Sequence, residues 1–141
     1  MSELITIDVR STRREELIDV TPLVISAIKR GGVASGLACI FCPHTTAAVT
    51  IQENSDPDVR TDMVAHLARS VPQDPRFKHS EANADAHIKS SLIGSSVTLI
   101  IDGGRPVLGT WQAVFFCEFD GPRDRRLMVK VIGNRKGSPD V

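Results

Sequence analysis

Short runs of apolar and β-branched residues recur along this sequence, and turn-forming residues interrupt them each time. Such runs favour β-strands, and their number limits the fold to one dominated by sheet. Residues 96–102 (SVTLIID) and 111–119 (WQAVFFCEF) are two long examples, joined through GGRPVLGT. Further strands are predicted at 3–9, 16–20, 36–42, 47–52 and 127–133. The polar RSTRRE between the first two predicts that a hairpin opens the fold, and hairpin-like connections are expected throughout.

Three helices are predicted between these strands. One begins at Thr21 and Pro22 and ends at the glycine pair 31–32, because proline suits a first helical turn and glycine a helix end. Asp56 is expected to cap a second helix that reaches about residue 70, and Asn83 a third that runs from 84 to 93. The pattern predicts one α+β domain over residues 1–141, a mostly antiparallel two-sheet β-sandwich with about three helices.

Charge and composition exclude several classes of protein. Seventeen basic and seventeen acidic side chains cancel, so neither nucleic acid nor an anionic membrane surface is an expected partner. No apolar run approaches the length of a membrane span, and no signal peptide is evident, so a cytoplasmic protein is expected. Cys39 and Cys42 should face opposite sides of a strand, and Cys117 lies in an apolar run; all three are interpreted as unpaired thiols.

The segment HSEANADAH, residues 79–87, gathers two imidazoles, two carboxylates and a carboxamide. With His44, which lies in the turn-like PHTT, His79 and His87 make three histidines, and three protein ligands are the usual set of a catalytic metal site. The alternative is that these are surface or general-base histidines. His66, on the second predicted helix, is assigned to structure.

Other polar side chains lie near the same elements. Glu53 and Asn54 end a predicted strand, and Glu118 follows GTWQ. Gly103 and Gly104 either offer backbone amides to a phosphate or form a hairpin turn. The three arginines of GPRDRRL are placed on a turn, where they either bind phosphate oxygens or form a solvated edge.

Three segments carry a resemblance to a known family: PHTTAAVTIQENSDPDVRTDM, HSEANADAHIKSSLIG and GGRPVLGTWQAVFFCE. Together they resemble the YjbQ family, described as secondary thiamine-phosphate synthases, and the likeness spans nearly the whole chain. One departure is Ala82, where the family more often has glycine.

The resemblance implies a compact homotrimer with its polar motifs in one pocket near a subunit boundary. It implies a reaction, as a secondary activity, in which a hydroxymethylpyrimidine diphosphate and a thiazole phosphate give thiamine phosphate and pyrophosphate. The matching positions are His44, Glu53, Asn54, Asp62, His79, Glu81, His87, Lys89, Ser91, Thr110, Trp111, Gln112, Glu118 and Arg125.

Roles are expected for most of these positions and, from their own chemistry, for Gly104 and Arg105. Catalytic roles are expected for Glu53, Asn54, Glu81, Lys89, Gln112 and Glu118. Phosphate binding is expected for Lys89, Ser91, Gly104, Arg105, Thr110 and Arg125. A zinc or other transition ion is expected at His44, His79 and His87, with magnesium as the alternative for a diphosphate substrate. Two other functions remain open: a metal-dependent hydrolase of a phosphorylated small molecule, and a non-catalytic small-molecule or metal-binding module.

Trp111 is the only tryptophan of the chain. Tryptophan is mostly a core residue, so Trp111 is expected to pack beneath its strand. Thr110 and Gln112 alternate with it and should face the opposite side of the strand. Either their side chains contribute to the pocket, or the segment is simply a strand that begins after a turn.

Overall fold

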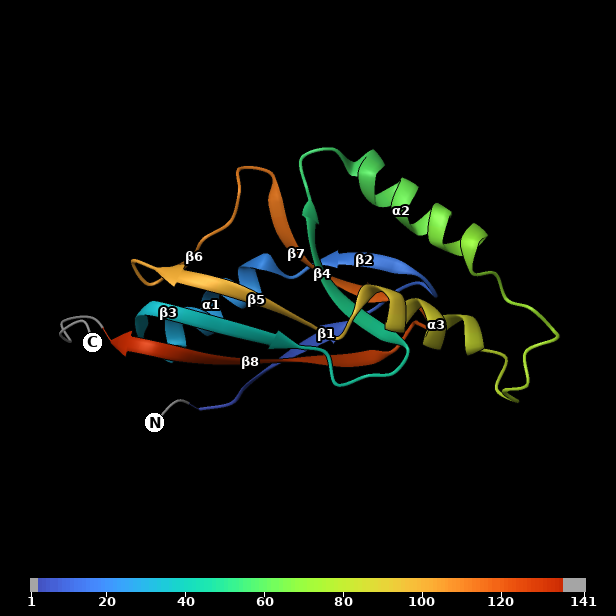
Figure 1. The fold of residues 1–141 in the computed structure, drawn as a ribbon, viewed down its shortest axis with the longest axis horizontal. Helices are drawn as coiled ribbons and strands as arrows, with labels where there is room; N and C mark the ends of the chain where they lie inside the picture. Colours follow the sequence, from blue (N-terminus) through green and yellow to red (C-terminus); the bar gives the residue numbers. More distant parts are fainter. Residues whose placement is uncertain (1–2, 136–141) are drawn as a thin grey trace.

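The computed structural model describes residues 3–135, which form two antiparallel sheets and three helices. The larger sheet has the strand order β1-β8-β3-β5-β6 and the smaller one β2-β7-β4 (Figure 1). The strands are β1 (Ile5–Arg10), β2 (Glu16–Asp19), β3 (Val33–Phe41), β4 (Ala47–Glu53), β5 (Ser96–Asp102), β6 (Arg105–Pro106), β7 (Gln112–Glu118) and β8 (Asp124–Arg135). The helices are α1 (Thr21–Gly31), α2 (Pro57–Ser70) and α3 (Ala84–Ile93). The predicted α+β class with two antiparallel sheets is confirmed.

Successive strands mostly change sheet, so the predicted opening hairpin is wrong. β1 pairs with β8, whereas β2 pairs with β7. The turn between β1 and β2 is bound instead to the β7–β8 connection: the Ser11 amide donates to the Arg123 carbonyl, and the Ser11 hydroxyl donates to Glu118. Likewise 96–102 and 111–119 lie in different sheets, and the only pair formed by consecutive strands in the described chain is β5 with the short β6.

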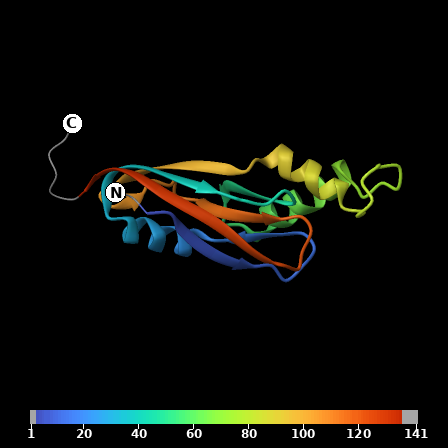
Figure 2. The same ribbon diagram turned by 90° about the horizontal axis from the view of Figure 1, so that it is seen from below.

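The main core lies where the two sheets and α1 meet (Figure 2). Side chains of the larger sheet, such as Ile40 and Leu127, pack there with Val49 and Phe116 of the smaller sheet and with Ile28 of α1. Alternation is clear in β1, where every second residue is buried, because its other face is solvated.

Strand β7 is buried on both faces, which explains its continuous apolar sequence. One face contributes to the main core. The other supports a second cluster, in which Phe115 and Cys117 pack with Ala86 of α3 and with the partly buried Met63 and Leu67 of α2. The two helices α2 and α3 therefore cover the outer face of the smaller sheet.

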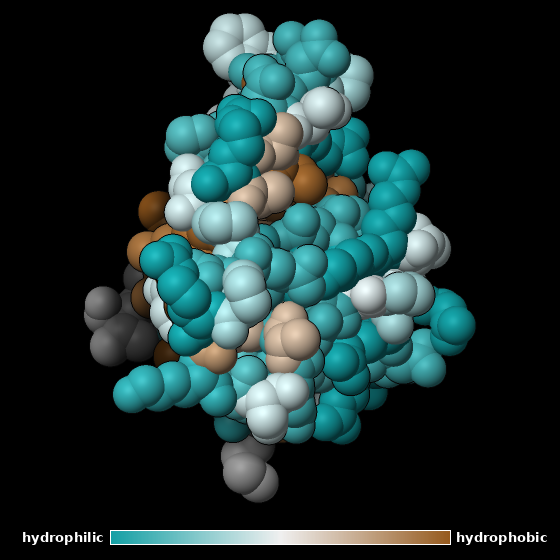
Figure 3. Space-filling view, turned by 90° about the vertical axis from the view of Figure 1, so that its right-hand side faces the viewer, coloured by the Kyte–Doolittle hydropathy of each residue, from teal (hydrophilic) through white to brown (hydrophobic). Residues whose placement is uncertain are grey.

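Helix α2 packs loosely on that face, since none of its residues is fully buried. Asp56 caps it as predicted, with its side chain accepting from the Asp58 amide at 2.9 Å. Figure 3 shows hydrophobic surface in the hollow below the uppermost layer of the molecule, which α2 forms. Asn83 precedes α3 as predicted, but its amide group donates to Asp120 and does not cap the helix.

The outward face of the larger sheet carries an apolar patch made of Leu37, Ile100 and Ile132. Leu37 of β3 is paired in register with Ile100 of β5 and with Ile132 of β8, and all three side chains are exposed. Cys39 of β3 is exposed and Cys42, directly after the strand, is buried, so the two thiols face opposite sides as predicted. No helix within residues 3–135 is long and apolar enough to cross a membrane.

Candidate functional site

The candidate residues fall into three separate groups rather than one pocket. We call them the indole edge (Asn54, Thr110, Trp111 and Gln112), the histidine loop (His79, Glu81 and His87) and the buried pair (Glu118 and Arg125). The indole edge lies where β4 ends and β7 begins, and the histidine loop lies at the far end of the molecule, in the connection between α2 and α3 and the first turn of α3 (Figure 1).

The indole edge is a hydrogen-bonded turn that presents Trp111 to solvent. The backbone amide of Gln112 donates to the Gly109 carbonyl, and the backbone amide of Gly109 donates to the side-chain oxygen Oε1 of Gln112 at 2.8 Å. The backbone amide of Asn54 donates to the Trp111 carbonyl at 2.9 Å. Trp111 is 65% exposed, so the prediction of a core tryptophan is wrong. The reason is that β7 begins only at Gln112, so strand alternation does not apply to residues 109–111.

A hollow of about 260 Å³ beside the indole is lined by polar groups. The side-chain amide of Asn54 donates to Asp19 Oδ2 at 2.6 Å, and Asp19 Oδ1 accepts from the backbone amide of Thr21 at 2.9 Å. Asn54 Oδ1 is buried without a partner in residues 3–135. Sequence reasoning missed Asp19, although aspartate side chains often accept from the backbone amide two residues further on, as Asp19 does from Thr21. Glu53, the last residue of β4, is half-buried and precedes Asn54 in the chain, but it does not line this hollow.

The histidine loop brings His79 and His87 together as expected from their spacing. Their ring centroids are 5.1 Å apart in an edge-to-face arrangement, and His79 Nε2 lies 3.8 Å from Glu81 Oε2. A cavity of about 400 Å³ is lined by His79, Ala82 and Asp85 among others. Ala82 has φ 60°, a left-handed conformation that favours glycine, so the residue that departs from the family pattern is also the strained one.

Lys89 is only 1% exposed and lies in a network of four charges behind the histidine loop. It pairs with Glu15 and, at 2.9 Å, with Asp85, which also accepts from both terminal nitrogens of Arg14 at 3.1 Å. Burial alone would raise the pKa of the Asp85 carboxyl, but hydrogen bonds from Arg14 and Lys89 bring it below its ordinary value. Because its ammonium group is enclosed by carboxylates, Lys89 is not available to a phosphate here, contrary to the sequence prediction.

Sequence reasoning missed the partners of Lys89. The sequence places Arg14 and Glu15 only in a polar turn, and it predicts no role for Asp85. The spacing of Asp85 and Lys89, four residues apart on a helix, was the signal that could have revealed their pairing. The network fixes α3 against the segment between β1 and β2.

Glu118 and Arg125 form a buried ion pair, with side chains 0% and 6% exposed. Arg125 Nε donates to Glu118 Oε1 at 2.9 Å, Arg125 Nη2 donates to Thr46 Oγ1 at 2.8 Å, and the Ser11 hydroxyl donates to Glu118. Burial alone would raise the pKa of the Glu118 carboxyl, but the bonds from Arg125 and Ser11 lower it overall. Arg125 lies within β8 rather than on the predicted turn, and the pair is committed to the interior rather than to a substrate.

His44 is separated from the other two histidines. Its Nε2 accepts from the Arg126 amide at 2.9 Å, and its ring lies edge-on to Phe116 at 6.3 Å. Burial, followed by the charge of Arg125, lowers the pKa of His44, which favours the neutral ring. When Nε2 of a neutral imidazole accepts, the proton is on Nδ1, so neither nitrogen is a free metal ligand.

The predicted three-histidine metal site is therefore not assembled within one chain. No group of three or more histidine, cysteine, aspartate or glutamate side chains in residues 3–135 is arranged to hold a metal ion. The residues of a single chain do not fit the expected transition ion, and a carboxylate-rich magnesium site is equally missing from this part of the chain.

The glycine pair before β6 forms a hairpin turn, the second of its two predicted alternatives. Gly103 and Gly104 have φ values of 59° and 77°, and the Gly104 amide donates to the Ala34 carbonyl at 2.9 Å. Gly104 therefore has no free amide for a phosphate. Arg105 is exposed on β6 and lines neither the cavity at the histidine loop nor the hollow at the indole edge.

Three further candidates lie on helix surfaces. Asp62 is exposed on α2 and lines an apolar groove. His66, assigned to structure, lies 3.2 Å from the Ser70 hydroxyl through Nε2. The Ser91 hydroxyl donates to the His87 carbonyl one turn earlier in α3, so it is engaged with its own helix.

Residues 5–134 match the model of a protein family described as UPF0047 protein YjbQ-like. The UPF0047 protein MJ1081 of Methanocaldococcus jannaschii is 53% identical over 127 residues, which cover 90% of this chain and 92% of that protein. The UPF0047 protein YugU of Bacillus subtilis is 46% identical, with 91% and 98% covered.

Solved structures agree with this match. A crystal structure of a YjbQ/UPF0047 protein from Clostridium acetobutylicum superposes with a TM-score of 0.88 at 48% identity, covering 91% of this chain and 99% of that one. The hypothetical protein APE1520 from Aeropyrum pernix has the same TM-score at 34% identity, with 94% and 99% covered. The similarity thus extends over the fold and over all three candidate groups.

Proposed function

We propose, because the chain belongs to the YjbQ-like UPF0047 family, that it acts in the cytoplasm as a transferase of the secondary thiamine-phosphate synthase kind. In this reaction the ring nitrogen of a thiazole phosphate attacks the exocyclic methylene carbon of a hydroxymethylpyrimidine diphosphate. The bond from that carbon to the diphosphate oxygen breaks, and pyrophosphate leaves with the electron pair. The site must hold two flat rings and stabilise the negative charge of the leaving group.

The exposed indole of Trp111 is the observation that carries the proposal. Burying a tryptophan is strongly favourable, so one that is 65% exposed at a turn fixed by hydrogen bonds is held outward at a cost. A rigid aromatic plane of this kind binds another flat ring by stacking. In the proposal it receives the pyrimidine or the thiazole, with Thr110 and Gln112 at its border.

The histidine loop supplies the donors for the diphosphate. Each imidazole of His79 and His87 offers a ring N–H to a phosphate oxygen. His79 lines an open cavity, and the ring of His87, on α3, lies beside that of His79. Lys89 and Arg125 are left out of this role, because carboxylates already engage both of them. No step is assigned to a metal ion.

In the proposal, the indole edge of one chain meets the histidine loop of another within a homotrimer. The two groups line different cavities of the single chain, so one chain does not bring a stacked ring to the histidines. The exposed patch of Leu37, Ile100 and Ile132 supports association, because apolar side chains that adjoin across three strands are typical of interfaces.

Subunit mixing tests this arrangement. Trp111→Ala and His87→Ala should each abolish formation of thiamine phosphate when present in every chain. In trimers assembled at random from equal amounts of the two variants, an intact site needs the tryptophan from one variant and the histidine from the other. About a quarter of wild-type activity should return, since each condition is met half the time. Active single variants, or inactive mixed trimers of normal size, would refute the shared site.

The products formed distinguish the proposed reaction from the other two functions. The transferase releases pyrophosphate only when both substrates are present. A phosphomonoester hydrolase releases inorganic phosphate from the thiazole phosphate alone, and a binding module releases neither. Wild-type protein that binds both substrates without turnover would overturn the transferase proposal.

A further inference from the structure

A groove separates α2 from the β1–β2 connection and the start of β2, on the opposite side of α2 from the apolar groove that Asp62 lines. Its volume is about 540 Å³, within the range of about 300–1,000 Å³ that is usual for small-molecule sites. It exists because α2 contacts the smaller sheet through partly buried side chains only. None of the residues of the indole edge or the histidine loop lines it.

Two arginines line this groove without an anionic partner. Neither Arg13 nor Arg60 makes an ion pair, or a side-chain hydrogen bond through its guanidinium, with any residue in the range 3–135. Arg60 is half-buried, with its Cζ 5.3 Å from the centroid of the Phe115 ring, which fixes the guanidinium in place by a cation–π contact. Each guanidinium therefore keeps its N–H donors for a ligand.

The two carboxylates of the groove, by contrast, are already engaged. Glu16 accepts from the Arg13 amide at 3.3 Å and from the amide and hydroxyl of Thr12. Glu15 pairs with the buried Lys89. Glu15 is ion-paired and Glu16 is hydrogen-bonded to neutral groups, whereas both guanidinium groups keep free N–H donors, so the groove offers binding groups to an anion.

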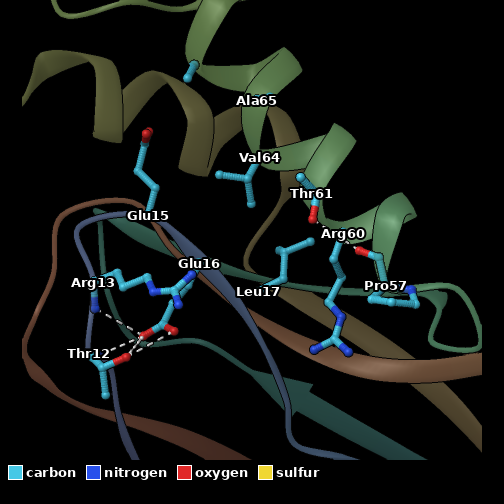
Figure 4. A pocket seen from close by; sticks show the side chains of 11 residues that line it. Thr12, Arg13, Glu15, Glu16, Leu17, Pro57, Arg60, Thr61, Val64 and Ala65 are labelled. Atoms are coloured by element: carbon cyan, nitrogen blue, oxygen red, sulfur yellow. Dashed lines mark hydrogen bonds between the residues drawn. The ribbon is translucent and has the colours of Figure 1, made fainter.

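The wall between the two arginines is apolar. Figure 4 shows Leu17 between Arg13 on one side and Arg60 on the other, with Val64 of α2 above it. Ala65 extends the same wall along the helix. An anion that binds here would thus place an apolar body against Leu17 and Val64.

We propose that this groove is a binding site for small organic anions, in which an aryl or alkyl group bears a phosphate or carboxylate. Arg60 binds the anionic group through its fixed guanidinium, and Arg13 closes the groove from the opposite side. The apolar body packs on Leu17 and Val64. This site is separate from the proposed transferase site, and its test needs no turnover.

Titration of the isotopically labelled full chain with phenyl phosphate tests the site by amide chemical shifts. Saturable shifts are expected at Leu17, Thr61 and Val64, and benzoate should reproduce them. Phenol and inorganic phosphate, each tested alone, should bind at least tenfold more weakly, because each supplies only half of the recognised features. Arg60→Gln should raise the Kd for phenyl phosphate tenfold or more.

Arg69→Gln is the matched control, since Arg69 is exposed on the same helix but does not line the groove. It should leave the Kd within twofold. If Arg60→Gln lowers the melting temperature strongly, Arg13→Gln provides the second variant and should also weaken binding. The proposal is overturned by no saturation at 10 mM, by equal effects of Arg60→Gln and Arg69→Gln, or by shifts confined to the histidine loop.

Discussion

Replacing Arg125 by methionine should destabilise the protein strongly, because it leaves the Glu118 carboxylate charged in the interior. Glu118 is fully buried, and Arg125 provides two of the donors that it accepts. Breaking a buried ion pair on one side costs about 3–5 kcal/mol, a large part of the roughly 5–15 kcal/mol that stabilises an ordinary domain. For a chain of this size the melting temperature should fall by about 10–20 °C.

The effect should depend on pH in a defined direction. Because the pKa of Glu118 in the folded protein lies below its unfolded value, the ionised pair stabilises the fold above about pH 4.3, and this contribution is lost as pH falls through the folded-state pKa. Arg125→Met removes the main cause of the low pKa. Its deficit relative to the wild type should therefore be largest near neutral pH and shrink in acid.

Urea unfolding, followed by far-ultraviolet circular dichroism, measures both effects. Arg126→Met is the control, since its side chain is exposed on the next position of the same strand, and it should cost under about 0.5 kcal/mol. The double variant Glu118→Met and Arg125→Met should be more stable than Arg125→Met alone. A loss under about 1 kcal/mol in Arg125→Met, or a double variant no better than the single one, would refute this account of the buried pair.

Three other outcomes are expected. Trp111→Ala should change the free energy of unfolding by less than about 1 kcal/mol, rather than by the roughly 3–5 kcal/mol typical of a core aromatic. A larger loss in urea unfolding would show that the ring is packed against the protein in solution. Ala82→Gly should stabilise the protein by about 0.5–1 kcal/mol in the same assay, because it relieves the left-handed backbone; a destabilised variant would contradict this. A thiol reagent should modify Cys39 in the native protein but neither Cys42 nor Cys117. Burial raises the pKa of the Cys42 thiol to about 11, and it also raises the pKa of Cys117. Mass spectrometry of the labelled chain decides this.

The sequence predicts the three helices and every strand except the short β6, but it does not predict how the strands pair. Proline at the start of α1 and α2, and the continuous apolar run of β7, are local signals that survive in the structure. Strand partners are not local: β2 pairs with β7, and the Ser11 bonds to Arg123 and Glu118 that direct the chain to the other layer span more than half of the sequence. Because β1 and β2 are adjacent in the chain, the sequence favours a hairpin between them. The pairing of β2 with β7 and the Ser11 hydrogen bonds place the two strands in different sheets instead.

The candidate site shows the same limit at the level of side chains. The sequence predicts Lys89 and Arg125 as cations that bind phosphate. It could not see that Glu15 and Glu118 already neutralise them. It placed His79 beside His87 correctly because their separation is local.

The pairing of β1 with β8 has a consequence for synthesis of the chain. Ile5 lies opposite Val129, and β8 also pairs with β3, so β8 is the shared partner of two earlier strands. The larger sheet cannot be completed until the ribosome has released β8. Contacts between residues so distant in sequence also slow folding. Until then β1 and β3 lack β8, the strand with which both pair. A nascent chain stalled before Asp124 therefore exposes the edges of these two strands to other nascent chains and to chaperones.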